Sequence, residues 1–158
     1  MGQQNNIVEF YNILQMSVKN HLGNDIDFMF STNPETELSF SETGFISSIE
    51  INGVLNGELY IFTSKRALEF ILGKAYSMDY SELESQGLIQ DSLNEFLNEI
   101  IANSTEQLSE AKITIDIGVP SPKDFGTIKE FRERFKTVLK INAPDDAFYL
   151  ILVEKCAT

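Results

Sequence analysis

The sequence contains little of the chemistry on which many enzymes depend. Its 158 residues include one cysteine, one histidine, four prolines and no tryptophan. Cys156 has no partner for an intramolecular disulfide, so we expect a reducing, cytoplasmic setting. With one histidine and no Cys or His cluster, a transition-metal site would lack its usual ligands, so no metal of its own is expected. His21 lies near the end of an amphipathic helix and is predicted to be structural.

Long apolar runs and basic patches are also missing. No apolar stretch approaches the roughly 20 residues needed to cross a bilayer, so no membrane insertion is expected. The formal charge of -12 is spread along the chain and would repel a phosphate backbone, which argues against a nucleic-acid partner. The 42% hydrophobic content is enough for one substantial core, and we expect a single domain over residues 1–158.

Apolar periodicity predicts alternating helices and strands. Ser64 is expected to cap the second helix, Gly73 to stop it, and Ser81 to open a short helical turn after it. Residues 122–135 fit either a helix or a loop with a short strand. The expected helices cover residues 5–22, about 65–76 and 88–108, and the expected strands cover residues 26–30, 44–51, 55–63, 113–119, 136–141 and 147–153.

The order of these elements predicts the fold class. The order predicts two similar halves, of about residues 5–64 and 88–154, joined by a helix of about residues 65–76. Each half combines a helix with strands. We therefore expect an α/β (α+β) domain in which an antiparallel-rich sheet, built from both halves, is covered on one face by the long helices.

The outer face of the third helix carries a candidate site. At about 100° per residue, Asp91, Glu95 and Asn98 fall on one side of the helix, opposite the apolar stripe centred on Leu93. An alternative explanation is local, because Ser92 and Glu95 have the spacing of a capping box at a helix start. Helix geometry alone favours that explanation.

A longer pattern favours a functional site. Asp91 is followed after three residues by Glu95, after two more by Asn98, and after 21 more by Pro120. This pattern resembles the signature of the CheC, CheX and FliY phosphatases of bacterial chemotaxis. The preceding segments NGVLNGELYIF, with Gly53 and Gly57, and SKRALEFILGKAY look like the hairpin and helix that precede the motif in CheX-like proteins.

The resemblance implies a CheC-like fold and a protein phosphatase that acts on the phosphoaspartate of a CheY-like receiver. Asn98 would orient the attacking water, and Glu95 would pair with a lysine of the receiver. Asp91 and Pro120 would support the site. The resemblance also implies a homodimer joined through sheet edges, and no cofactor of its own, with Mg²⁺ supplied by the receiver.

The first helix carries a weaker copy of the pattern. Glu9 is followed after two residues by Asn12 and after 21 more by Pro34, with Asn5 at the position of Asp or Ser. CheC-like members carry two such sites, whereas CheX-like members use only the later helix. Because Met16 is bulky and would obstruct a docked receiver, we interpret Glu9 and Asn12 as a degenerate second site.

Two other functions stay open. Relatives often have small residues where this chain has Leu97 and Ile101, so the domain could be a non-catalytic receiver-binding module, akin to the middle domain of the flagellar switch protein FliM. An unrelated sensor domain with a small ligand is supported only by the number of aromatic residues.

Overall fold

The computed structural model describes residues 2–31, 44–124 and 137–155. Within these residues the chain forms one sheet and five helices. The helices are α1 (Gly2–Leu22), α3 (Lys65–Tyr76), α4 (Tyr80–Ser85), α5 (Ile89–Ala102) and α6 (Thr105–Glu110). The strands are β1 (Asp27–Ser31), β2 (Phe45–Gly53), β3 (Gly57–Thr63), β4 (Ile115–Ile117), β5 (Ser121–Pro122), β6 (Val138–Asn142) and β7 (Ala147–Glu154).

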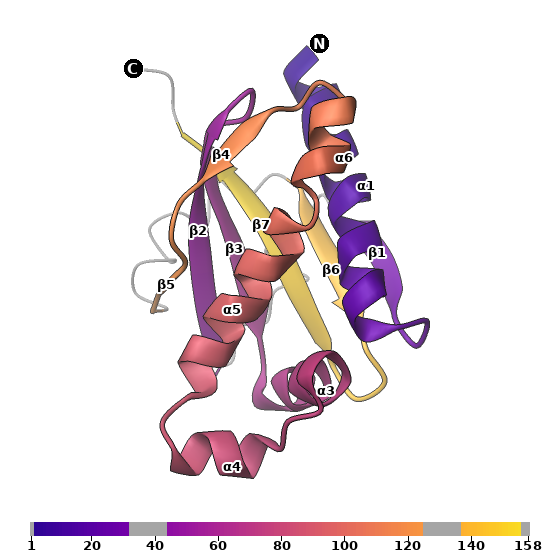
Figure 1. The fold of residues 1–158 in the computed structure, drawn as a ribbon. Helices are drawn as coiled ribbons and strands as arrows, with labels where there is room; N and C mark the ends of the chain where they lie inside the picture. The colour runs from indigo at the N-terminus through magenta and orange to yellow at the C-terminus, as the bar shows by residue number, and fades with distance from the viewer. Residues whose placement is uncertain (1, 32–43, 125–136, 156–158) are drawn as a thin grey trace.

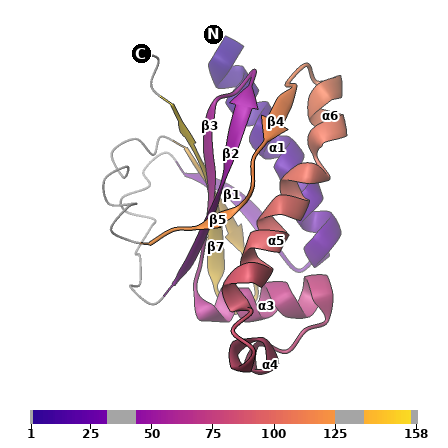
Figure 2. The same ribbon diagram turned by 60° about the vertical axis from the view of Figure 1, so that its left-hand side comes forward.

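The sheet is antiparallel throughout. Its strand order is β1-β6-β7-β3-β2-β4, with the short β5 also paired to β2. The two apolar strands β3 and β7 pair along their length at the centre, from Gly57 opposite Glu154 to Thr63 opposite Phe148. The described helices lie on one side of this sheet (Figures 1 and 2). The predicted antiparallel sheet with covering helices is therefore confirmed.

The core lies between the helices and the sheet. Helix α5 packs across β2, with α1 beside it (Figure 1). Its apolar stripe is fully buried, and each large apolar side chain removed from water contributes roughly 1.5–3 kcal/mol. Leu97 and Ile101 belong to this buried stripe, so their bulk is directed away from the outer face. The buried members of the stripe are Leu93, Phe96, Leu97, Ile100 and Ile101, each at 0% exposure.

The third predicted helix, residues 88–108, is in fact two helices. Helix α5 ends at Ala102, and α6 begins at Thr105. The Ser104 hydroxyl donates to the carbonyl of Ile100 at 2.8 Å, and the Thr105 hydroxyl donates to the carbonyl of Ala102 at 2.8 Å. Such side-chain bonds compete with the helical ladder, which explains the break that apolar periodicity alone had hidden.

The range of about 65–76 predicted for the second helix matches α3, but two predicted boundary residues, Gly73 and Ser81, were wrong. Helix α3 passes Gly73 and ends only at Tyr76, where Ser77 takes the left-handed φ of 53°. Helix α4 is capped by Asp79, whose carboxylate accepts from the Ser81 amide at 3.0 Å, so Ser81 lies inside the helix. The N-cap at Ser64 is confirmed, since its hydroxyl accepts from the amide of Ala67 at 3.2 Å.

The strands largely agree with the predicted ranges, with three main differences, one of which is that the short β5 was not predicted. Strand β2 runs through Gly53, so the turn to β3 lies after the predicted Asn52-Gly53. The predicted strand over residues 113–119 is reduced to β4. Of the ambiguous segment 122–135, residues 125–135 lie outside the described part of the chain.

Candidate functional site

Four of the predicted site residues line one surface hollow. The hollow has a volume of about 340 Å³ and lies between the outer face of α5 and the segment that joins β4 to β5. Residues separated by more than 20 positions in the sequence meet here because α5 and this segment both pack on β2. The lining residues are Asp91, Asn94, Glu95 and Asn98 from α5, and Gly118, Val119 and Pro120 from the facing segment.

The polar groups of the predicted motif are not used to hold the fold. Asp91 and Glu95 are exposed and Asn98 is half-buried. Within the described part of the chain, none of the three makes a hydrogen bond or an ion pair. The capping-box explanation is wrong, because the Ser92 hydroxyl donates to the carbonyl of Leu88 at 2.8 Å inside the helix. The carboxylate of Glu95 and the amide of Asn98 are therefore available to a partner.

The facing wall of the hollow is formed by Gly118, Val119 and Pro120. The amide of Gly118 donates to the carbonyl of Glu50 in β2 at 2.9 Å. Val119 is 86% exposed. Pro120 follows, and Ser121 then pairs with Ser48 of β2. Since proline has no backbone N–H, the chain leaves the sheet here without losing a ladder bond, and the wall of the hollow is formed by that excursion.

The floor of the hollow contains a residue that the sequence analysis missed, Asn94. Its side-chain oxygen accepts from the hydroxyl of Ser47 at 2.6 Å and from the amide of Gln90 at 3.0 Å. The Gln90 amide also donates to the carbonyl of Ile46 at 3.1 Å. These bonds join α5 to β2. Asn94 lies one turn before Asn98, and this i, i+4 spacing was the signal available in the sequence.

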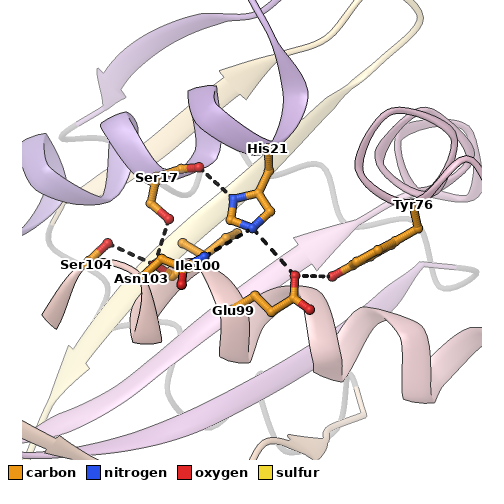
Figure 3. Close-up of polar contacts among 7 residues, drawn as sticks. All are labelled: Ser17, His21, Tyr76, Glu99, Ile100, Asn103 and Ser104. Atoms are coloured by element: carbon orange, nitrogen blue, oxygen red, sulfur yellow. Dashed lines mark hydrogen bonds and ion pairs between the residues drawn. The ribbon is translucent and has the colours of Figure 1, made fainter.

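The side of α5 that faces α1 and α3 is held by a separate polar cluster (Figure 3). The hydroxyl of Tyr76 donates to the carboxylate of Glu99 at 2.9 Å, and His21 Nε2 lies 3.5 Å from the same oxygen. Burial first, and then the hydrogen bond to Glu99, raise the pKa of the Tyr76 hydroxyl, so it remains a donor near neutral pH. Ser17 fastens α1 to α5 through the carbonyl of Ile100 at 2.8 Å. The cluster orients α5 and leaves its outer face open.

The first-helix residues Glu9 and Asn12 do not join the hollow. Both are exposed on α1, and Met16, one turn later, is 52% exposed. Pro34 lies outside the described residues. The interpretation of Glu9 and Asn12 as a degenerate site therefore stays a prediction.

Two further features, a metal-binding cluster and a membrane-spanning helix, are absent from the described residues. These residues contain no group of three or more His, Cys, Asp and Glu side chains that could hold a metal ion. None of their helices is both long enough and apolar enough to cross a bilayer.

The protein therefore combines an antiparallel sheet, covered on one face by helices, with a surface hollow. Helix α5 presents an acid, Glu95, and an amide, Asn98, to this hollow. Solved structures that share this fold include CheX and CheC-like chemotaxis proteins, so the predicted CheC-like fold is confirmed. No sequence-family model matches the chain, and no curated protein sequence matches it.

Three solved structures illustrate the likeness. A chain of the CheX-CheY-BeF₃-Mg²⁺ complex from Borrelia burgdorferi has a TM-score of 0.71 and 16% identity, covering 95% of this chain and 97% of its own. A CheC-like superfamily protein from Shewanella sp. PV-4 has a TM-score of 0.64 and 12% identity, with coverage of 96% and 97%. The FliM middle domain from Vibrio alginolyticus has a TM-score of 0.53 and 11% identity, with coverage of 96% and 93%.

Proposed function

We propose that this protein is a phosphatase that removes the phosphoryl group from the phosphoaspartate of a CheY-like receiver. The observation that carries the proposal is the position of Glu95 and Asn98. Both line one hollow with Asp91 and Pro120, and neither has a hydrogen-bonding partner within the described residues. A structural neighbour of the same fold was solved in complex with CheY, BeF₃ and Mg²⁺, which supports a receiver as the partner.

The reaction needs little chemistry from this chain. Water attacks the phosphorus in line, the bond from phosphorus to the aspartate oxygen breaks, and the products are the aspartate carboxylate and inorganic phosphate. Mg²⁺ bound by the receiver would neutralise charge on the phosphoryl oxygens. The remaining task for this protein is to hold the attacking water in line with the phosphorus–oxygen bond that breaks. The side chain of Asn98 can accept and donate hydrogen bonds while uncharged, so it can hold this water without repelling the phosphoryl group.

The other site residues have supporting tasks in this proposal. Glu95, one turn before Asn98, would pair with a lysine of the receiver and set the docked orientation. Asp91 lies in the first turn of α5, where a negative charge is favoured by the helix dipole. Pro120 forms the opposite wall of the hollow.

The direct test is phosphate release. Each purified receiver of the source organism is phosphorylated with a small phosphodonor, and its dephosphorylation is followed with and without this protein. We expect the protein to accelerate phosphate release from at least one receiver. If a receiver binds and its phosphoryl lifetime is unchanged, the alternative of a non-catalytic binding module, supported by the fold shared with the FliM middle domain, replaces the proposal.

The role of Glu95 is tested by Glu95→Gln. A charge-assisted bond contributes about 1.5–3 kcal/mol, so we expect KM for the phosphorylated receiver to rise by roughly 10- to 100-fold with little change in kcat. The salt dependence of KM should also weaken.

Glu9→Gln is the matched control, because it removes the same charge from the corresponding position of α1. It should leave KM within about twofold of the parent, as expected for a distant surface change. A fall in kcat with unchanged KM in Glu95→Gln would contradict the docking role.

We extend the proposal to a homodimer joined through β1. This strand lies at one edge of the described sheet, and it exposes Met29 by 50% and Phe30 by 41%. An edge with apolar side chains and unpaired backbone groups is suited to pairing with a second copy. Sedimentation velocity should show a dimer that Met29→Lys dissociates and Val54→Lys, at the far turn, does not. Equal dimerisation of both variants would place the contact elsewhere.

A further inference from the structure

The orientation of the Asn94 side chain follows from its bonding partners. The carbonyl of Ile46 can only accept, so the Gln90 atom that faces it at 3.1 Å must be the NH₂ group. The same NH₂ group lies 3.0 Å from Asn94, so the Asn94 atom at that contact must be the oxygen. Ser47, buried at 0% exposure, donates to this oxygen as well, at 2.6 Å. The amide of Asn94 therefore has one possible assignment of oxygen and nitrogen.

The NH₂ group of Asn94 is left unused. Within the described residues Asn94 makes hydrogen bonds only through its oxygen, and its nitrogen has no partner. The side chain is half-buried and lines the hollow together with Glu95 and Asn98. Since the oxygen is turned toward β2 and held by two donors, the hollow contains a hydrogen-bond donor whose orientation is set before any partner binds.

We propose that Asn94 is a substrate-contacting residue whose NH₂ group donates a hydrogen bond to an acceptor oxygen of the docked receiver. The inference rests on the proposed function. An amide nitrogen can only donate, so its partner must be an acceptor, and the acceptors expected at the receiver's site are oxygens of the phosphoryl group and of the main-chain carbonyls beside it. The carboxylates of Asp91 and Glu95 in the same hollow would repel a phosphoryl group, and a neutral donor at Asn94 offsets this repulsion locally.

The bonds to Ser47 and Gln90 hold the Asn94 side chain in place before the receiver binds. A side chain that is already immobilised loses little conformational freedom when the partner binds. In enzymes, removing one such oriented donor to a developing charge lowers the rate by about 100-fold or more. Ser47 and Gln90 are positioning residues in this scheme, since they act through Asn94.

The most informative variant for this inference is Asn94→Asp. Its carboxylate can still accept from Ser47 and Gln90, so the floor of the hollow is kept, while the donor toward the receiver is replaced by a negatively charged acceptor. We expect kcat/KM for the phosphorylated receiver to fall about 100-fold with an unchanged thermal unfolding midpoint. Asn20→Asp, an exposed change on α1 with the same added charge, should stay within about twofold of the parent.

Two further measurements separate the possible acceptors and test the positioning. If Asn94→Asp weakens binding of the phosphorylated receiver alone, the acceptor is a phosphoryl oxygen; if it weakens binding of the unphosphorylated receiver equally, the acceptor is a main-chain carbonyl.

Ser47→Ala, which frees one side of the Asn94 amide, should lower kcat/KM by a smaller factor, about 5- to 10-fold, consistent with one neutral hydrogen bond.

The outcomes distinguish this inference from the proposed function. If the parent accelerates phosphate release and Asn94→Asp does so within twofold, the inference is overturned and the proposed function stands. If the parent neither binds nor dephosphorylates any receiver, both are overturned.

Discussion

Asn98→Ala is expected to lower kcat for receiver dephosphorylation by about 100-fold or more, because in the proposed mechanism it removes the group that would hold the attacking water in line. KM should change little, since the proposed mechanism assigns docking to Glu95. The fold should be unaffected: Asn98 makes no hydrogen bond with the described residues, and a surface change of this kind costs within about 0.5 kcal/mol. The measurement is phosphate release under single-turnover conditions, with unfolding in urea as the check on stability.

The matched control for this prediction lies on the first helix. Asn12→Ala removes the same side chain from the corresponding position of α1, where Asn12 is exposed and outside the hollow. It should leave kcat within about twofold of the parent. If Asn98→Ala were as active as the parent, the water-orienting role would be refuted. If Asn12→Ala lost activity instead, the site on α1 would be the working one.

Gly57→Ala is expected to cost about 3 kcal/mol or more of the free energy of unfolding. An added Cβ at this position would lie 2.2 Å from the carbonyl oxygen of Val153 and 3.0 Å from Cα of Glu154. Both are backbone atoms of β7, so β3 could accept the methyl group only by moving away from its neighbour at the centre of the sheet. Urea unfolding should show the loss as a lower midpoint.

Gly73→Ala is the control for the same chemical change. Gly73 lies within α3, and nothing lies within 4 Å of the Cβ that the substitution would add. Alanine favours a helix by about 1 kcal/mol over glycine, so this variant should be more stable than the parent. A destabilisation of less than about 1 kcal/mol in Gly57→Ala would show that the sheet adjusts to the methyl group, contrary to the expectation.

The elements that could be predicted from the sequence are those in which local pattern and tertiary packing agree. The apolar stripe of α5 was read from its spacing, and Leu93, Phe96 and Ile100 are all fully buried. The cap at Ser64 depends only on residues within one turn, so local reasoning was sufficient. Helix ends were harder to predict, because Ser104 ends α5 through a bond that competes with the helical ladder rather than through a glycine or a proline.

The candidate site likewise contains some residues whose placement could be predicted from the sequence and others whose placement could not. Asp91, Glu95 and Asn98 share a helix face as a direct consequence of the 3.6-residue period, so their mutual placement could be derived from the sequence. The position of Pro120 across the hollow could not, since it depends on how β4 and β5 pair with β2. Asn94 was missed because its role depends on Ser47, 47 positions earlier in the chain.

The sequence by itself determined which residues face outward from α5, because a helix turns by a fixed angle per residue. Its spaced motif also predicted a CheC-like fold. Only the tertiary structure decided that these side chains line a hollow, that the polar groups of Asp91, Glu95 and Asn98 have no partner among the described residues, and that the Asn94 amide is held in one orientation. These are properties of contacts between segments far apart in the chain, and local spacing contains no information on distances between such segments.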